Sequence, residues 1–283
     1  HEQKRPGIVE GGKEAFDEAR EDLEALAGIE DQTKQVERVS EAIGEQIEAI
    51  HRKERKAALA GKVVLLHSTP KMYVAIDGTG VPMVPRETRD RPGKDGPAKT
   101  REVKLGCVFT QTSLDEKGRP VRDPGSTTYV GAIETSEEFA GRIFAEAIRR
   151  GMRRADKTIV LGDGALWIWN LADEHFPGAI QIVDLYHARE HLGELAKVLY
   201  GPGTPKARTW ADLRIVELDE GDVEKVISSM NRVRPSTTAQ QDELRRSVAY
   251  FQTNAHRMRY ADFRQQGLFV GSGVIEAGCK TIA

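Results

Sequence analysis

Cysteine is scarce in this chain, which has only Cys107 and Cys279 among its 283 residues. Two cysteines cannot build a disulfide framework, and no Cys-x-x-Cys pair offers the spacing of a zinc site. This usage favours a reducing, intracellular compartment. No apolar run is long enough to span a membrane, and no signal-peptide pattern opens the sequence. We therefore expect a cytoplasmic protein with no membrane partner.

A dominant charge is also lacking, because 42 basic residues nearly balance 44 acidic ones and the formal net charge is −2. This balance argues against a protein that coats nucleic acid through its overall charge, although local basic patches remain open. A chain of this length can bury a substantial core in one large or two small domains. Since the sequence begins at His1 rather than Met, we expect a fragment of a longer protein.

The first 60 residues are charged and helical in pattern. Apolar residues recur there at three- and four-residue steps and predict a stripe on one helix face: Val36, Val39, Ile43, Ile47 and Ile50. An earlier helix is expected over 16–26, and Gly28 lies between the two. This N-terminal helical segment, 1–60, fits a helix-turn-helix. A plain helical hairpin or a coiled-coil contact is favoured, because no basic recognition face stands out.

Strands and helices alternate after Gly61. Strands are predicted at 71–77, 102–110, 127–133, 158–161 and 179–183. A helix is predicted over 136–154, with Ser136 as its N-cap, and a mostly helical stretch over 187–266. The Pro- and Gly-rich stretch 86–101 is expected to be an exposed loop. This order predicts a mixed α/β sheet with an α-helical insertion, preceded by the helical N-terminal segment.

Three acids stand at informative positions. Asp77 and Asp163 each follow an apolar run, and Glu276 lies about one turn into a helix that Ser272 would cap. Taken singly, Asp77 also fits a turn, and Glu276 also fits a helical ion pair with Lys280. Taken together, three carboxylates suit Mg²⁺ or Mn²⁺, and two such ions can clamp the attacking and leaving oxygens of a phosphoryl transfer.

A second cluster follows the apolar run that ends at Asp184. His187, Glu190 and His191 match the H-x-x-E-H pattern of inverzincin metalloproteases, in which Glu276 would become a further zinc ligand. A supporting role is favoured instead. In that role Asp184 holds the His187 ring, and both residues support the site.

Basic and aromatic residues add candidates for nucleic-acid contact. The basic candidates lie in the loop, upstream of Glu276 and just after it: Arg86, Arg89, Arg257, Arg259, Arg264 and Lys280. For each of them, a solvated surface is the alternative. The three tryptophans, Trp167, Trp169 and Trp210, could stack on bases, although such residues are more often in the core.

Four blocks of sequence carry a family resemblance: VAIDGTGVPM, YVGAIETSEEF, LGDGALWIWNLADEHFPGAIQIVDLYHAREHL and MRYADFRQQGLFVGSGVIEAGCK. They resemble bacterial insertion-sequence transposases of the ISKra type, which are related to the Mutator-like DDE superfamily. The resemblance covers roughly residues 71–283. It implies an RNase H-like catalytic domain over 61–283, with a helical insertion at about 188–266 before the last catalytic acid and an early C-terminal end.

The resemblance also implies which residues act. It implies a catalytic, metal-binding triad of Asp77, Asp163 and Glu276 with two Mg²⁺ (or Mn²⁺) ions. The family's C/D-x-x-H signature falls on Asp184 and His187. That match favours Asp163 over Asp184 as the second acid and leaves Asp184 and His187 as support.

The implied activity is metal-dependent DNA strand cleavage and strand transfer by a transposase. Its partners would be the transposon ends, the target DNA and at least one further copy of the chain, on the bacterial nucleoid. Two other functions remain open. One is a truncated DNA-binding remnant without catalysis, and the other is a zinc hydrolase centred on His187 and His191.

Overall fold

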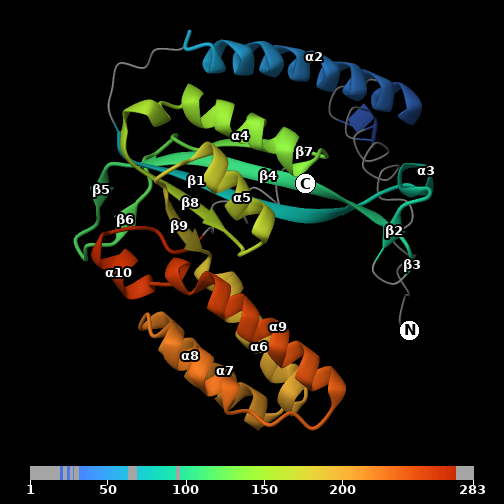
Figure 1. The fold of residues 1–283 in the computed structure, drawn as a ribbon. Helices are drawn as coiled ribbons and strands as arrows, with labels where there is room; N and C mark the ends of the chain where they lie inside the picture. The colour runs from blue at the N-terminus through green and yellow to red at the C-terminus, as the bar shows by residue number, and fades with distance from the viewer. Residues whose placement is uncertain are drawn as a thin grey trace. The chain divides into compact units, whose positions relative to one another are not determined.

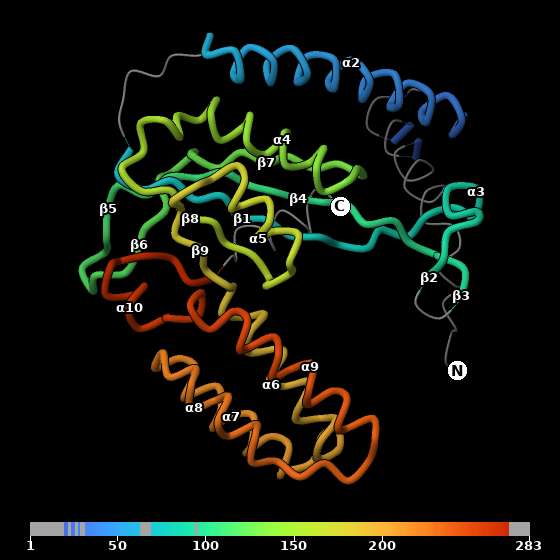
Figure 2. The backbone as a smooth tube through the Cα atoms, in the orientation of Figure 1, coloured from blue at the N-terminus to red at the C-terminus, as the bar shows by residue number. Residues whose placement is uncertain are grey.

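The computed structural model describes residues 20–21, 24–25, 28, 32–62, 69–93 and 96–271. The chain divides into two compact units. The first comprises His1–Val63, Gly78–Val103 and Ala283, and the second comprises Val64–Asp77 and Lys104–Ile282. Figures 1 and 2 follow the chain through both units. The predicted site residues Glu276 and Lys280, and the predicted cap Ser272, lie outside the described residues.

A five-stranded mixed sheet with the order β7-β4-β1-β8-β9 organises the second unit (Figure 1). Its strands are β1 (Thr69–Pro82), β4 (Thr100–Gln111), β7 (Thr128–Ala132), β8 (Ala155–Gly162) and β9 (Ile180–Val183). All five correspond to predicted strands. Strand β4 pairs antiparallel with β7, whereas β1 with β8 and β8 with β9 are parallel pairs.

The direction of β4 identifies the fold. The C-terminal end of β1 lies beside the start of β4. Gly78 is next to Glu102 and Gly80 is next to Thr100, so the two strands run in opposite directions. Of the five strands, only β4 runs against the others. The first three strands along the chain therefore lie in reverse order, and the last two extend the sheet beyond β1. This is the RNase H-like arrangement, and it confirms the predicted fold class.

The strands are apolar because helices cover the sheet. Residues 72–76 of β1 are all buried, as expected of a central strand that has a neighbour on each side and helices on the sheet. Two glycines allow helices to approach closely. A Cβ on Gly106 of β4 would lie 2.7 Å from Ile143 of α4 (Ser136–Arg149), and a Cβ on Gly162 would lie 2.8 Å from Ile168 of α5 (Leu166–His175).

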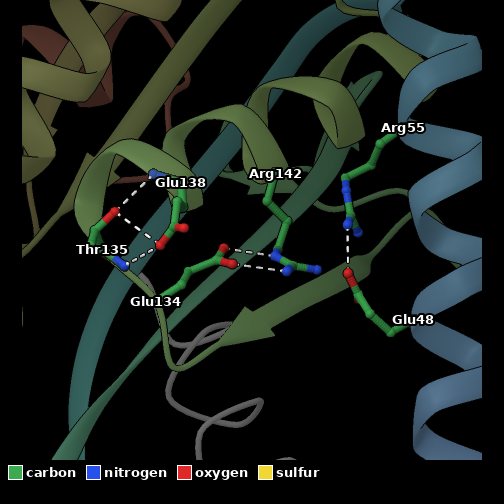
Figure 3. Close-up of polar contacts among 6 residues, drawn as sticks. All are labelled: Glu48, Arg55, Glu134, Thr135, Glu138 and Arg142. Carbon is green, nitrogen blue, oxygen red and sulfur yellow. Dashed lines mark hydrogen bonds and ion pairs between the residues drawn. The ribbon is translucent and has the colours of Figure 1, made fainter.

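Helix α4 begins with a capping box. Its N-cap is Thr135, so the prediction of Ser136 is wrong by one residue. The Thr135 hydroxyl accepts a hydrogen bond from the Glu138 N–H at 3.2 Å, and the Thr135 N–H donates to Glu138 Oε2 at 3.0 Å (Figure 3). Arg142 then forms a two-bonded ion pair with Glu134, at 2.8 and 2.9 Å.

The same helix ends earlier than predicted. It stops at Arg149, and Gly151 follows with φ 98°, a left-handed conformation that favours glycine. A short 3₁₀ turn, Met152–Arg154, then leads into β8. The predicted helix over 136–154 is therefore two elements, because residues 149–154, four arginines around Gly151 and Met152, do not continue the apolar face beyond Ile148.

The predicted helical stretch is present after β9. Its helices are α6 (Leu185–Tyr200), α7 (Pro205–Asp219), α8 (Val223–Asn231), α9 (Thr238–Asn254) and α10 (Tyr260–Gln265). Helix α6 packs on α7 and α9, and α8 packs on the same two helices (Figure 2). The four longer helices form a small bundle that returns the chain to the sheet.

Within the described part of the first unit there is one long helix, α2 (Thr33–Leu59), which carries the predicted apolar stripe. Within the expected earlier helix over 16–26, the four described residues, 20–21 and 24–25, are helical. The loop at 86–101 is mostly exposed, as predicted, and includes the short helix α3 (Pro85–Thr88) and the hairpin of β2 (Pro92–Gly93) with β3 (Gly96–Pro97). Among the described helices, none is both long and apolar enough to cross a membrane.

The corrected cap gives a first test. Thr135→Ala should lower the free energy of unfolding by about 0.5–2 kcal/mol, because the Glu138 N–H loses the hydroxyl oxygen that accepts its hydrogen bond. Ser136→Ala, at the next position, is the control and should change it far less. Urea unfolding of both variants measures the difference, and equal effects would contradict the assignment of Thr135 as the N-cap.

Candidate active site at the carboxyl edge of the sheet

Three aspartates form a row across three neighbouring parallel strands. The register aligns Ile76 of β1 with Gly162 of β8, and Gly162 with Val183 of β9. The residues that directly follow these three positions are Asp77, Asp163 and Asp184. Neighbouring strands lie about 4.8 Å apart, so each aspartate stands roughly one strand spacing from the next. The predicted acids Asp77 and Asp163 are therefore brought together.

Asp77 does not end its strand, contrary to the prediction. Strand β1 continues to Pro82, whereas its pairing with β8 ends after Ile76. The edge at Asp77 is thus created by the departure of β8, which turns away at Asp163. The half-buried Asp77 side chain lies on a strand that remains paired with β4, and this holds its backbone in place.

Asp163 is fixed by two hydrogen bonds. Its Oδ1 accepts from the Ala165 N–H at 2.8 Å, which closes a tight turn after β8. Its carbonyl oxygen accepts from the hydroxyl of Tyr250 at 2.7 Å. Between these contacts, Gly164 has φ 104°, and a Cβ there would lie 2.5 Å from the Tyr250 ring. A residue of the helical insertion therefore clamps the backbone of a candidate catalytic acid.

Tyr250 was not identified from the sequence. It lies on α9, 87 residues beyond Asp163, and the only local sign of it is the glycine at position 164. Burial, reinforced by the negative charge of Asp163, raises the pKa of the Tyr250 hydroxyl. The phenol therefore stays protonated and keeps donating its hydrogen bond.

His191 stacks on the Tyr250 ring. The ring centroids are 4.1 Å apart and the planes differ by 20°. Desolvation lowers the pKa of His191, an effect that the negative charge of Asp163 partly offsets. A neutral imidazole is therefore favoured near pH 7, as suits a stacked ring. In this structure His191 packs against the Tyr250 ring, whereas the alternative prediction made His191 a zinc ligand.

Asp184 is a helix cap. It is fully buried, and its Oδ1 accepts from the backbone N–H groups of Tyr186 at 2.7 Å and His187 at 3.2 Å. Its contact with His187 is thus to the backbone, whereas the His187 ring Nδ1 lies 3.8 Å from Glu190. The prediction that Asp184 holds the His187 ring stays a prediction. In the structure Asp184 starts α6, because Asp is a favoured N-cap.

The segment that follows the helical insertion, residues 267–269, is hydrogen-bonded to side chains of β1 and β4. The Gly267 carbonyl accepts from Gln111 Nε2 at 2.9 Å and from Lys71 Nζ at 3.1 Å. Gln111 in turn accepts from the hydroxyl of Tyr73 at 2.5 Å, and that hydroxyl accepts from the Phe269 N–H at 3.3 Å. Residues 267–269 are therefore held against β1 and β4.

Two further contacts bring this segment to the row of aspartates. The carbonyl of Val270 accepts from the Leu185 N–H at 2.9 Å, directly after Asp184. A Cβ on Gly271 would lie 2.6 Å from the Tyr186 ring, so the backbone passes closely over that ring. Gly271 precedes the predicted acid Glu276 by five residues along the chain.

The predicted zinc site gains no support within the described ranges. No group of three or more His, Cys, Asp or Glu side chains that could hold a metal occurs there. His187 lies near Glu190, while His191 stacks on Tyr250. The H-x-x-E-H match is thus accounted for by contacts along and beside α6.

The predicted DNA-contact residues differ in availability. Arg257 is buried, donates to Gln181 at 2.7 Å and covers the Trp169 ring at 4.6 Å, so its guanidinium is an internal contact. Arg259 pairs with Glu224, and Arg264 donates to the Asp219 carbonyl. Arg86 and Arg89, in the first unit, are exposed.

The tryptophans belong to the packed interior. Trp169 is buried in the core, and Trp167 and Trp210 are half-buried and pack against it. The alternative in which tryptophans stack on bases therefore loses its support.

Comparison with known proteins adds a structural likeness. No protein-family model and no curated protein matches the sequence. Among solved structures, the chain is similar to the Drosophila P element transposase in its strand transfer complex, with a TM-score of 0.28 and 11% sequence identity. The match covers 75% of this chain and 49% of that one, so this chain spans about half its length. The fold assignment rests on the strand order.

The contact between Gly164 and Tyr250 gives a second test. Gly164→Ala should lower the free energy of unfolding by roughly 1–3 kcal/mol, because the residue has positive φ and no room for a methyl group. Gly193→Ala is the matched control: Gly193 lies inside α6 with open space around it, and alanine should stabilise that helix by about 0.5–1 kcal/mol. Thermal unfolding measures both, and a neutral Gly164→Ala would contradict the clamp.

Proposed function

We propose that this chain is the catalytic part of a DNA transposase of the ISKra type, which cuts and joins DNA strands with Asp77, Asp163 and Glu276 as its catalytic acids. The observation that carries the proposal is the register of the parallel strands, which sets Asp77 and Asp163 side by side where β8 leaves the sheet. The sequence resemblance supports the same two residues independently of the register.

The donor set fits a hard divalent cation. Asp77 and Asp163 offer carboxylate oxygens about one strand spacing apart, and Mg²⁺ or Mn²⁺ prefers such ligands at roughly 2.1 Å. Glu276 would complete the set for two ions. When bound, the ions would activate the attacking oxygen and stabilise the leaving one. The protein's own part is to hold the two aspartates rigidly, through strand pairing for Asp77 and through Ala165 and Tyr250 for Asp163.

The surroundings of Asp163 and Asp184 favour Asp163 as the second acid. Asp184 is fully buried, and one of its carboxylate oxygens already accepts two backbone N–H groups. Asp163 is half-buried and accepts one backbone N–H through Oδ1. A cation that approaches from solvent would therefore meet the Asp163 carboxylate more easily, and Asp184 would keep α6 in place beneath it.

The path of the chain supports Glu276 as the third acid. Val270 and Gly271 contact Leu185 and Tyr186, the two residues that follow Asp184. A helix rises about 1.5 Å per residue, so an acid five residues later is within roughly 8 Å along a helical path. The insertion thus returns the chain to the row of aspartates at the point where the third acid is needed.

The proposed reaction is a pair of in-line displacements on DNA. Water first attacks a phosphodiester at the transposon end, and the strand breaks with release of a 3′-hydroxyl. That hydroxyl then attacks a phosphodiester of the target DNA. The 3′-oxygen of the target strand leaves from the same phosphorus, so one P–O bond forms as one breaks. No covalent protein–DNA intermediate is required. Arg86 and Arg89, which are exposed, are the proposed phosphate contacts, and assembly on DNA would involve at least two copies of the chain.

The proposal predicts that Asp77→Asn and Asp163→Asn abolish Mg²⁺-dependent cleavage while folding and salt-dependent DNA binding persist. We expect a fall of at least about 100-fold, because even the loss of a residue that only orients a ligand typically costs 10–100-fold. Asp156→Asn, at the exposed start of β8, is the matched control and should cleave normally. A nicking assay on supercoiled DNA measures all three. Retained cleavage in either site variant would overturn the triad, and DNA binding without nicking by the unmodified chain would support the inactive remnant.

A further variant separates the two candidate second acids. Asp184→Asn should leave cleavage within about threefold of the unmodified chain, because asparagine caps a helix as well as aspartate does. If Asp184→Asn abolishes nicking and Asp163→Asn does not, Asp184 is the metal ligand. Circular dichroism on each variant checks that α6 remains folded.

A further inference from the structure

Helix α2 carries a row of exposed apolar side chains. Val39, Ile43, Ile47 and Ile50 are 47–55% exposed, and the half-buried Val36 continues the row. Exposed apolar stripes of this length on a helix mark interaction sites. With 27 residues, α2 is about 40 Å long, which is enough for a two-helix coiled coil.

The spacing of the row is the same in both directions. Its members lie seven and four residues on either side of Ile43: Val36 and Val39 before it, Ile47 and Ile50 after it. In an antiparallel pair of α2 helices related by a two-fold axis at Ile43, every apolar residue is therefore level with another. Val36 is level with Ile50, Val39 with Ile47, and Ile43 with its own copy. Such self-complementarity is the requirement of a two-fold interface.

The charges of α2 favour the antiparallel orientation over the parallel one. Residues 33–48 hold four glutamates, with Lys34 and Arg38 as their only basic residues. Residues 51–59 hold four basic residues and only Glu54 as an acid. A parallel pair would place the two basic segments against each other. An antiparallel pair about Ile43 separates them by roughly 33 Å, well beyond the Debye length of about 8–10 Å.

The sides of the stripe allow close approach. Ala42 and Gly44 are its small neighbours, one on each side, and Ser40 and Gln46 are uncharged. Glycine inside a helix lowers its stability relative to alanine. A Cβ on Gly44 would meet nothing within 4 Å in the described structure outside its own helix. A second helix that packs against this face would explain why a small residue stands there.

We infer that α2 is a homodimerisation helix, which pairs antiparallel with α2 of a second copy about a two-fold axis at Ile43. The inference does not rest on the proposed function, because it uses only α2. The spacing of Val36 to Ile47 and of Val39 to Ile50 is eleven residues, which predicts a nearly straight or slightly right-handed pair.

Sedimentation velocity on the full chain without DNA tests the pairing. The unmodified chain should be a dimer at micromolar concentration. Ile43→Glu should weaken the dimer at least about tenfold, because it places two glutamates at the centre of the interface. Ala49→Glu adds the same charge outside the apolar row, about 120° around the helix from Ile43, and should remain dimeric. A monomeric unmodified chain, or a dimer unaffected by Ile43→Glu, would overturn the inference.

Cysteine crosslinking tests the orientation, in a Cys279→Ser background with the buried Cys107 retained. Ile43→Cys should crosslink to itself. Val36→Cys should crosslink when mixed with Ile50→Cys and remain uncrosslinked alone. Self-crosslinking of Val36→Cys would instead show a parallel pair and refute the antiparallel arrangement. Nicking activity is read separately, so the outcome for the dimer is independent of the outcome for the catalytic acids.

Discussion

The hydrogen-bonded register of β1, β8 and β9 is the constraint on which the candidate site depends. Because the three strands are parallel and aligned at Ile76, Gly162 and Val183, the residue after each of these positions belongs to one row. A slip of one residue in either pairing would turn an aspartate to the other face of the sheet. The buried apolar residues that precede the acids prevent such a slip, since they would lose their core positions.

The helical insertion is part of the site, although it is remote in sequence. Its α9 contributes Tyr250, which holds the Asp163 backbone, and α6 begins at Asp184 in the same row. The segment after α10 returns across the sheet through Gly267 and reaches Leu185 through Val270. The bundle therefore stabilises the turn after β8 and guides the chain towards the position proposed for Glu276.

Much of the sheet could be predicted because local pattern and burial agree there. The five strands are short apolar runs bounded by polar residues, and each was identified. The N-cap at Thr135 and the end of α4 were misplaced, because adjacent Thr135 and Ser136 are both good caps and the break at Gly151 follows a basic run with no apolar periodicity.

The site was predicted less completely than the sheet. Asp77 and Asp163 could be picked out because each follows an apolar strand. The role of Tyr250 could not, since nothing in the sequence near α9 indicates that its hydroxyl meets a carbonyl 87 residues away. The role of Asp184 as the N-cap of α6 could not be chosen from the sequence for a related reason: a spacing of three residues at a helix start suits a backbone cap as well as a side-chain contact.

The two units use their apolar residues in different ways. In the second unit, the sheet and helices cover one another, and the acids stand at the rim of a closed core. In the first unit, the apolar row on α2 keeps four large aliphatic side chains about half exposed. A two-fold pair of α2 helices would cover them and would also bring two candidate sites into one particle. The proposed joining of DNA requires two ends to be held at once, so the exposed stripe and the function proposed for the row of aspartates, which rest on unrelated observations, both call for two copies.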